Sequence, residues 1–357
     1  MGATYPSPPP RPRGRGGPRS VHSPPPVSGC PQPARRSGLR VVPGRDRGSM
    51  TTTLTARSPE DLLAVVPFVL GFEPADSIVM LTLGAAHAFH ARVDLPDDPR
   101  DVAEVLAVLL EPAVRHGAEA AVFLLYTGDD ALAREVVARL EQRGRAAPRL
   151  VEALRVDGGR WFSLRGCPPG AAGGVPYDLS GHAFVAGAVL EGRVLHRSRA
   201  ALAATLRPDP VAVAEVEAAR TGRPGSAAWV EQLLDRRVGR DDPLPAREAA
   251  RLLEAIADPS VRDVAWGRVR RGSARDDVRL WEALVRCAPE ELVPHAAAVL
   301  AFAAWIAGDG ALAWCAVDRA READPGHSLA ALVADVLTAA ISPAQWEDAC
   351  RRQRSVP

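Results

Sequence analysis

The order of apolar and polar positions over residues 58–207 predicts strands and helices in alternation. Apolar runs typical of strands cover residues 78–83, 88–95, 120–126, 150–156 and 160–164. Apolar residues at helical spacing fill the segments 97–117 and 129–144 between them. The resulting order of strand, strand, helix, strand, helix, strand and strand predicts a mixed sheet with helices packed against it.

A helix with clear end signals precedes the first of these strands. Ser58 is the expected N-cap, Pro59 takes the first helical position, and Asp61 stands three residues after the cap. Gly71 and Pro74 end the helix. We therefore expect Ser58 and Asp61 to stabilise the start of a helix rather than to carry chemistry.

Beyond Pro208 only the helical period remains, up to residue 353. Small residues in two of these segments have the spacing at which tetratricopeptide repeats pack their helices, at Ala297, Ala301, Ala304, Ala313 and Ala320. The expected fold class is therefore α/β (α+β): a mixed sheet with packed helices, followed by an all-α, tetratricopeptide-like region of helical hairpins. The expected domains are 50–207 and 208–357, preceded by a tail over 1–49.

The tail differs from the rest of the chain in charge and composition. Residues 1–49 hold nine Arg and a single acidic residue, whereas the remainder holds 35 Arg and 42 acidic residues. Twelve of the 33 prolines also lie in the tail, so we expect it to be disordered. Either it is a basic arm that contacts nucleic acid, or the protein truly starts at Met50, which we favour. No other nucleic-acid contact is expected, because the acidic body repels phosphate.

The residue types present exclude several chemistries. All 44 basic residues are Arg, so a phosphate-binding P-loop and Schiff-base chemistry lack their lysine. The five cysteines have no C-x-x-C spacing and stand at Cys30, Cys167, Cys287, Cys315 and Cys350. We therefore expect no metal, no cofactor and no disulfide framework, and a reducing cytoplasm fits. The apolar runs fall short of the ~20 residues that a membrane span needs.

An irregular, glycine-rich loop over residues 166–178 holds the candidate site. Guanidinium, thiol, phenol, carboxylate and hydroxyl groups gather in and near it, at Arg165, Cys167, Tyr177, Asp178, Ser198 and Arg199. Backbone N–H groups at the loop glycines can approach an anion. Each side chain also has a structural alternative, with Asp178 and Ser198 as caps, Tyr177 as a plug and Cys167 as a small buried residue.

With these residues noted, the chain resembles an actinobacterial family catalogued as domain of unknown function 4192. The resemblance is carried by Ser-Pro-Glu-Asp-Leu-Leu-Ala-Val-Val-Pro-Phe-Val-Leu-Gly-Phe-Glu-Pro-Ala-Asp-Ser-Ile-Val over 58–79. Gly-Val-Pro-Tyr-Asp-Leu over 174–179, the run 194–202 and the segment 300–325 support it. It extends over about 57–345 and implies relatives without implying an activity.

Two functional interpretations follow. The first is a cytoplasmic, non-enzymatic, partner-binding or regulatory protein whose helical C-terminal region binds another protein, as stacked helical hairpins commonly do. The second is an enzyme or sensor domain that binds a small anionic ligand at the 166–178 loop, where α/β sheets tend to bind ligands. The missing catalytic motifs favour the first, so we assign no catalytic residue.

Overall fold

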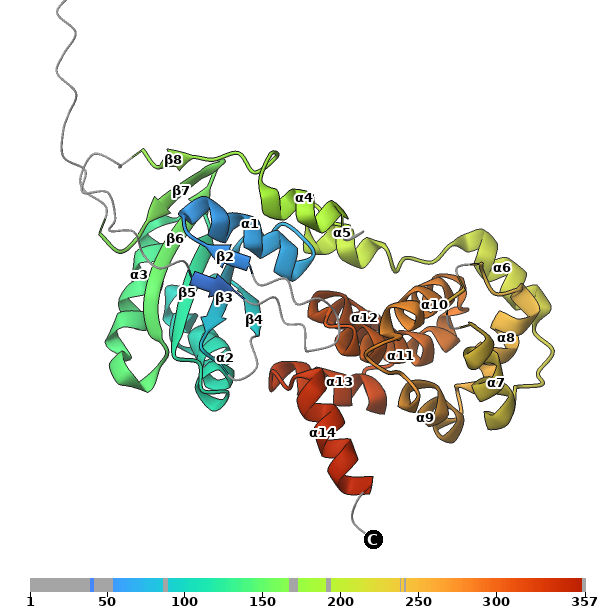
Figure 1. Ribbon diagram of the computed structural model, residues 1–357. Helices are drawn as coiled ribbons and strands as arrows, with labels where there is room; N and C mark the ends of the chain where they lie inside the picture. The colour runs from blue at the N-terminus through green and yellow to red at the C-terminus, as the bar shows by residue number, and fades with distance from the viewer. Residues whose placement is uncertain are drawn as a thin grey trace, which may run out of the picture. The chain divides into compact units, whose positions relative to one another are not determined.

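The computed structural model describes residues 39–41, 54–85, 89–166, 173–190, 194–237, 239–240 and 242–354 (Figure 1). The chain divides into two units, residues 1–35 and 36–357, and every described residue belongs to the second. The expected disordered tail therefore lies outside the described residues, except for Leu39–Val41. Cys167 lies outside them as well.

Among the described residues, six strands form one mixed sheet in the order β4-β3-β5-β6-β7-β8. They are β3 (Ser77–Leu83), β4 (His90–Asp94), β5 (Ala120–Tyr126), β6 (Arg149–Asp157), β7 (Arg160–Ser163) and β8 (Val175–Pro176). Strands β5 and β6 run parallel, and the other neighbours are antiparallel. The sheet confirms the mixed α/β fold class that the apolar pattern predicts.

Two further strands were not predicted. Strand β1 (Leu39–Val41) pairs antiparallel with β2 (Leu54–Ala56) in a small separate sheet. Their three-residue length explains why the apolar pattern misses them. The short edge strand β8, at the end of the irregular loop, escapes prediction for the same reason.

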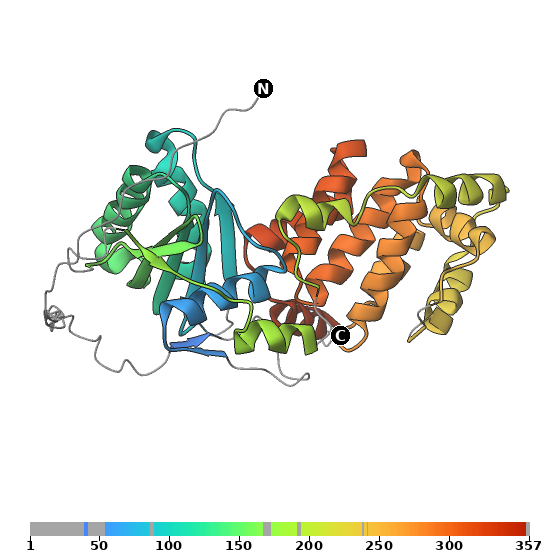
Figure 2. The same cartoon turned by 90° about the horizontal axis from the view of Figure 1, so that it is seen from above.

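Helices cover both faces of the main sheet (Figure 2). Helix α1 (Pro59–Leu70) lies on the face to which Val79, Leu81 and Val122 point. Helices α2 (Val102–Arg115) and α3 (Asp130–Gln142) pack on the opposite face. Strands buried on both faces carry continuous apolar runs, which is why β3 and β5 are easy to find in the sequence.

The remaining helices follow the sheet in the chain. Helices α4 (Ala183–Leu190) and α5 (Arg199–Ala204) come first. Then follow α6 (Pro210–Ala219), α7 (Ala227–Arg237), α8 (Ala246–Ala255), α9 (Pro259–Gly267), α10 (Ala274–Cys287), α11 (Val293–Ile306), α12 (Gly310–Ala323), α13 (Ser328–Thr338) and α14 (Pro343–Arg354). Short 3-10 turns occur at η1 (Pro99–Asp101), η2 (Gly144–Ala146) and η4 (Glu290–Leu292).

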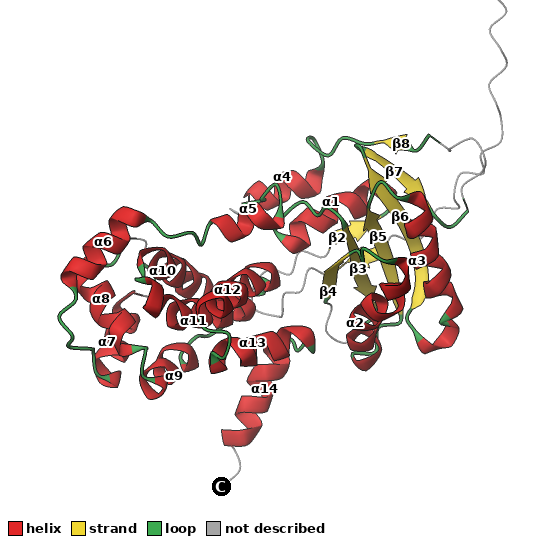
Figure 3. Cartoon of the chain, turned by 180° about the vertical axis from the view of Figure 1, so that it is seen from behind, coloured by secondary structure: helices red, strands yellow, loops and turns green. Residues whose placement is uncertain are grey.

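Helix α11 is the centre of this helical region (Figure 3). It packs against α10, α12 and α13, and all of its residues except His295 are buried. Its alanines allow the neighbouring helices to approach closely on all sides. Among the described helices none is by itself long and apolar enough to cross a membrane; only α13 and α14 taken together pass that test, with a bend of 114° between them.

Candidate functional site

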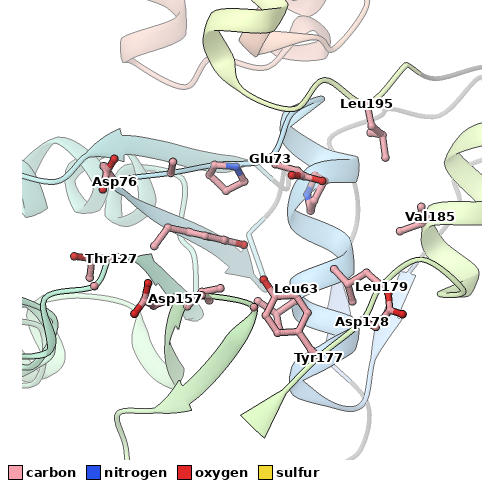
Figure 4. A pocket seen from close by; sticks show the side chains of 18 of the residues that line it. Leu63, Glu73, Asp76, Thr127, Asp157, Tyr177, Asp178, Leu179, Val185 and Leu195 are labelled. Carbon is pink, nitrogen blue, oxygen red and sulfur yellow. The ribbon is translucent and has the colours of Figure 1, made fainter. Parts of the chain in front are cut away.

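A pocket of about 610 Å³ lies at the carboxyl ends of β5 and β6, beside the first residue of β3 (Figure 4). Its lining includes Tyr126 and Thr127 after β5, and residues 156–159 at the tight turn after β6. The segment 73–76, which leads into β3, completes this side. The carboxyl ends of parallel strands are where open α/β sheets usually bind ligands.

One wall of the pocket is apolar. Leu63 and Pro67 of α1 face the pocket, together with Leu179, Val185 and Leu195 from the chain after β8. Helix α1 is positioned by its capping box, in which Ser58 Oγ accepts from the Asp61 N–H at 3.2 Å and Asp61 Oδ2 accepts from the Ser58 N–H at 3.2 Å. The capping residues expected from the sequence thus orient a helix that lines the pocket.

The phenols of Tyr126 and Tyr177 and the carboxylate of Glu73 belong to the polar part of the lining. Burial raises the pKa of Tyr126, and the nearby Tyr177 and Glu73 raise it further. Burial and the charge of Glu73 also raise the pKa of Tyr177. Both phenols therefore stay protonated at neutral pH. Neither donates a hydrogen bond to another described residue, so their O–H groups are available to a ligand.

Backbone contacts hold Glu73 in place. Its N–H donates to the carbonyl of His196 at 2.9 Å, and the His196 N–H donates to the carbonyl of Gly71 at 2.9 Å. Phe72 and His196 form an isolated parallel bridge at the same point. The position of Glu73 is thus fixed by a chain segment far away in the sequence.

Arg155 is not part of the lining, but it holds two lining residues, Thr127 and Asp157, in place. Its side chain is 8% exposed, and its Nη1 donates to the Thr127 carbonyl at 3.2 Å and to Asp157 Oδ2 at 3.4 Å. Its Nε lies 3.4 Å from Asp130 Oδ1, and its guanidinium stacks 3.7 Å from the centre of the Phe162 ring. Arg155 therefore fixes the turn after β5 against the end of β6.

Residues 177–185, which we call the strap, form the last wall. The Phe184 N–H donates to His182 Nδ1 at 3.2 Å, so His182 Nε2 carries the proton and donates to Asp61 Oδ1 at 3.0 Å. Asp178 Oδ1 accepts from the Ser180 N–H at 2.8 Å, which lowers the pKa of Asp178. One histidine thus ties the strap to the first turn of α1.

The pocket is acidic. Four carboxylates line it, at Glu73, Asp76, Asp157 and Asp178, and no basic side chain belongs to the lining within the described part of the chain. Asp157 is paired with Arg155, whereas Glu73 and Asp76 form no ion pair with a described residue. Asp76 also adopts a positive φ of 44°, which places the turn into β3.

The structure brings together two of the six residues that the sequence singled out. Tyr177 and Asp178 line the pocket, whereas Cys167 lies outside the described residues. Arg165 instead donates to the carbonyls of Leu150 at 2.7 Å and Val151 at 3.2 Å, and lies 3.3 Å from Glu141. It therefore binds the backbone near the start of β6 and does not line the pocket.

The two downstream residues have structural partners. Ser198 Oγ accepts from the Ala201 N–H at 3.0 Å and caps α5, as its alternative interpretation expected. Arg199 donates to Asp318 of α12 at 2.5 Å. Neither lines the pocket.

Sequence reasoning missed Tyr126, Asp157, Glu73 and Asp76. A signal for the first two was present, because Tyr126 ends one predicted strand and Asp157 follows another that runs parallel to it. For metals, no group of three or more histidine, cysteine or acidic side chains is arranged to hold an ion in the part of the chain that is described.

Comparison with known proteins gives a family. Neither the curated proteins nor the solved structures contain a match to this chain. The model of the family described as "Domain of unknown function (DUF4192)" matches residues 59–344, a range that runs from α1 to the start of α14 and includes every pocket residue. This match confirms the resemblance seen at residues 58–79, and the chain belongs to the DUF4192 family.

Proposed function

We propose that this protein binds a small organic molecule in the pocket at the ends of β5 and β6. The observation that carries the proposal is the lining itself, with two protonated phenols and unpaired carboxylates facing an apolar wall. A volume of about 610 Å³ lies within the range of roughly 300–1,000 Å³ common for ligand pockets. The acidic lining favours a ligand charge opposite to the anion expected from the sequence.

We propose a sensing or regulatory role rather than catalysis. The described lining residues include no histidine or cysteine, and phenols with raised pKa values are poor general bases near neutral pH. Cys287 and Cys315 are free thiols, which supports the cytoplasmic location expected from the sequence. In this role the bound molecule changes the protein rather than being changed by it.

The helical region from α6 to α14 is the proposed site for a protein partner, in the manner of tetratricopeptide-like hairpins. Support comes from α11, whose burial between its neighbours leaves the outer helices to form the surface. The ion pair between Arg199 of α5 and Asp318 of α12 provides a direct contact through which ligand binding can reach this region.

Ligand-detected NMR tests the pocket proposal with a panel of small amines, polyols and carboxylates. Val185→Trp fills the pocket from the strap. Val108→Trp makes the same change at a site on α2 that is 53% exposed and outside the lining, and serves as the matched control. At least one class of probe should bind the wild type and Val108→Trp and lose binding in Val185→Trp. Binding by no class, or binding that survives in Val185→Trp, contradicts the proposal.

Cross-linking of the full-length protein in native lysate tests the partner proposal. Cross-links to other proteins should map to α6–α14 and decrease when Arg199→Ala removes the contact with Asp318. Cross-links confined to the sheet and to α1–α3 would place the partner on the other part of the chain.

A further inference from the structure

We infer that the ligand of the pocket is an organic cation, such as a substituted ammonium, held between the rings of Tyr126 and Tyr177 with Glu73 as its counter-ion. This inference rests on the proposed function and specifies the chemical class of the ligand. It follows from the charges, the rings and the size of the pocket.

The charges of the lining favour a cation over an anion. Two basic side chains near the pocket are already engaged by carboxylates: Arg155 by Asp130 and Asp157, and Arg92 by Asp94 at 2.6 Å. A third, Arg160, donates to the backbone carbonyls of Gly173 and Gly174. Glu73 and Asp76 have no such partner among the described residues. An anion would therefore meet two uncompensated negative charges, whereas a cation would neutralise them.

The rings add a second attraction for a cation. Glu73 raises the pKa of Tyr126 and of Tyr177, so its carboxylate acts electrostatically on both rings. Tyrosine faces attract alkylated ammonium groups, and neutral phenols do so while leaving their O–H groups free to hydrogen-bond. Because Tyr126, Tyr177 and Glu73 line the same pocket, a cation bound there has both rings and the carboxylate around it.

The lining is not arranged for a bare metal ion, because no group of three or more histidine, cysteine or acidic side chains in the described part of the chain could hold one. About 610 Å³ accommodates an organic molecule, and its apolar wall of Leu63, Leu179 and Val185 offers nothing to a hydrated metal but packs well against methylene groups. The lining therefore fits a molecule with a charged head and an apolar body.

Isothermal titration at low salt tests the charge directly. The probes are choline and putrescine, each compared with the neutral molecule that replaces nitrogen by carbon or oxygen, 3,3-dimethylbutan-1-ol and butane-1,4-diol; acetate is the anionic probe. At least one cation should bind about tenfold more tightly than its neutral counterpart, and salt should weaken it.

Four variants assign the contributions. Tyr126→Phe should keep most of the affinity for the cation because the ring remains, whereas Tyr126→Leu should lose about tenfold. Glu73→Gln should weaken the cation and leave the neutral probe unchanged. Glu104→Gln, an exposed carboxylate on α2 outside the lining, is the matched control and should change neither. Thermal melting of each variant separates loss of binding from loss of folding.

The outcomes distinguish the two proposals. If a neutral or anionic probe binds as tightly as any cation, or if Glu73→Gln leaves cation affinity unchanged, the cation inference is overturned and the binding function stands. If neither these probes nor the NMR panel bind the wild type, both proposals are overturned.

Discussion

The sheet and the helical region use their charged residues in different ways. In the helical region, arginine and carboxylate groups meet in networks: Arg220 contacts Glu217, Glu254 and Glu291, and Arg319 contacts Glu290 and Glu322. At the carboxyl edge of the sheet, Glu73 and Asp76 have no partner among the described residues. The chain has 44 basic and 43 acidic residues, so a shortage of arginine does not explain the difference. Both carboxylates are exposed to solvent and no described residue neutralises them, so a cationic solute can reach them.

The largest expected effect is a loss of stability caused by a substitution in the helical core, which should leave ligand affinity in the pocket unchanged. Trp281 of α10 is fully buried, so Trp281→Ala should destabilise the protein by about 3–5 kcal/mol. Chemical denaturation measures this cost. Titration with the cation that binds best, at a temperature where the variant is folded, should give wild-type affinity. A loss of affinity in the folded variant would show that the two regions are not independent.

Arg155→Met removes the buried guanidinium behind the pocket. The Thr127 carbonyl and Asp157 lose their donor, so we expect destabilisation of about 1–3 kcal/mol together with weaker cation binding. Arg134→Met is the matched control, because Arg134 pairs with the same Asp130 at an exposed site and should cost about 0.5 kcal/mol or less. Equal effects of the two substitutions would mean that burial of Arg155 is unimportant.

The helical region should respond to pH through two buried groups with opposite signs. His327 is buried beside Arg262 and His295, at 3.3 Å and 3.1 Å, and burial and these neighbours lower its pKa to about 4. The unfolded chain takes up this proton near pH 6.5, so the folded state should lose stability as the pH falls from about 6.5 to about 4.

Asp277 has the opposite effect on stability over the same pH range. Burial raises its pKa to about 6, so its contribution to stability is present at low pH and is lost as the pH rises through about 6. In denaturation at pH 5 and pH 7.5, His327→Asn should reduce the loss at low pH, to which His295 with its lowered pKa also contributes, and Asp277→Asn should raise stability mainly at pH 7.5. A variant whose pH dependence equals that of the wild type would exclude its residue as a titrating group.

The smallest expected effect is at the strap. His182→Ala removes the hydrogen bond to Asp61 and should cost about 1 kcal/mol of stability, while it weakens cation binding by freeing a wall of the pocket. Val211→Ala, at a residue that is 69% exposed on α6, should change neither quantity. Unchanged cation affinity in His182→Ala would show that the strap stays in place without its histidine.

Local patterns were sufficient to predict much of the fold. Strand β5 was predicted with its observed bounds, because its apolar run is continuous and ends at Tyr126. The capping of α1 by Ser58 and Asp61 was predicted because a cap lies within one helical turn. Strands of two or three residues have no such local pattern and were missed.

The candidate site could be predicted only in part, because its contacts join distant parts of the chain. The Arg199–Asp318 pair spans 119 residues and the His182–Asp61 contact spans 121. Arg165 and Arg199 were candidate ligand-binding residues in the sequence, yet each has a protein partner that no local pattern identifies. Tyr177 and Asp178, selected as part of the loop, line the pocket, while Glu73 was assigned to a connection because its proximity to Tyr126 exists only in the fold.

Asp61 links the start of α1 to the strap, so the motions of these two segments should be coupled. One carboxylate accepts from backbone N–H groups at the start of α1 and from His182 of the strap. Fraying of the first helical turn and release of the strap should therefore be coupled opening events. A molecule that closes the strap should slow hydrogen–deuterium exchange of the backbone amides at residues 58–62, which gives a readout of pocket occupancy at a helix end outside the pocket.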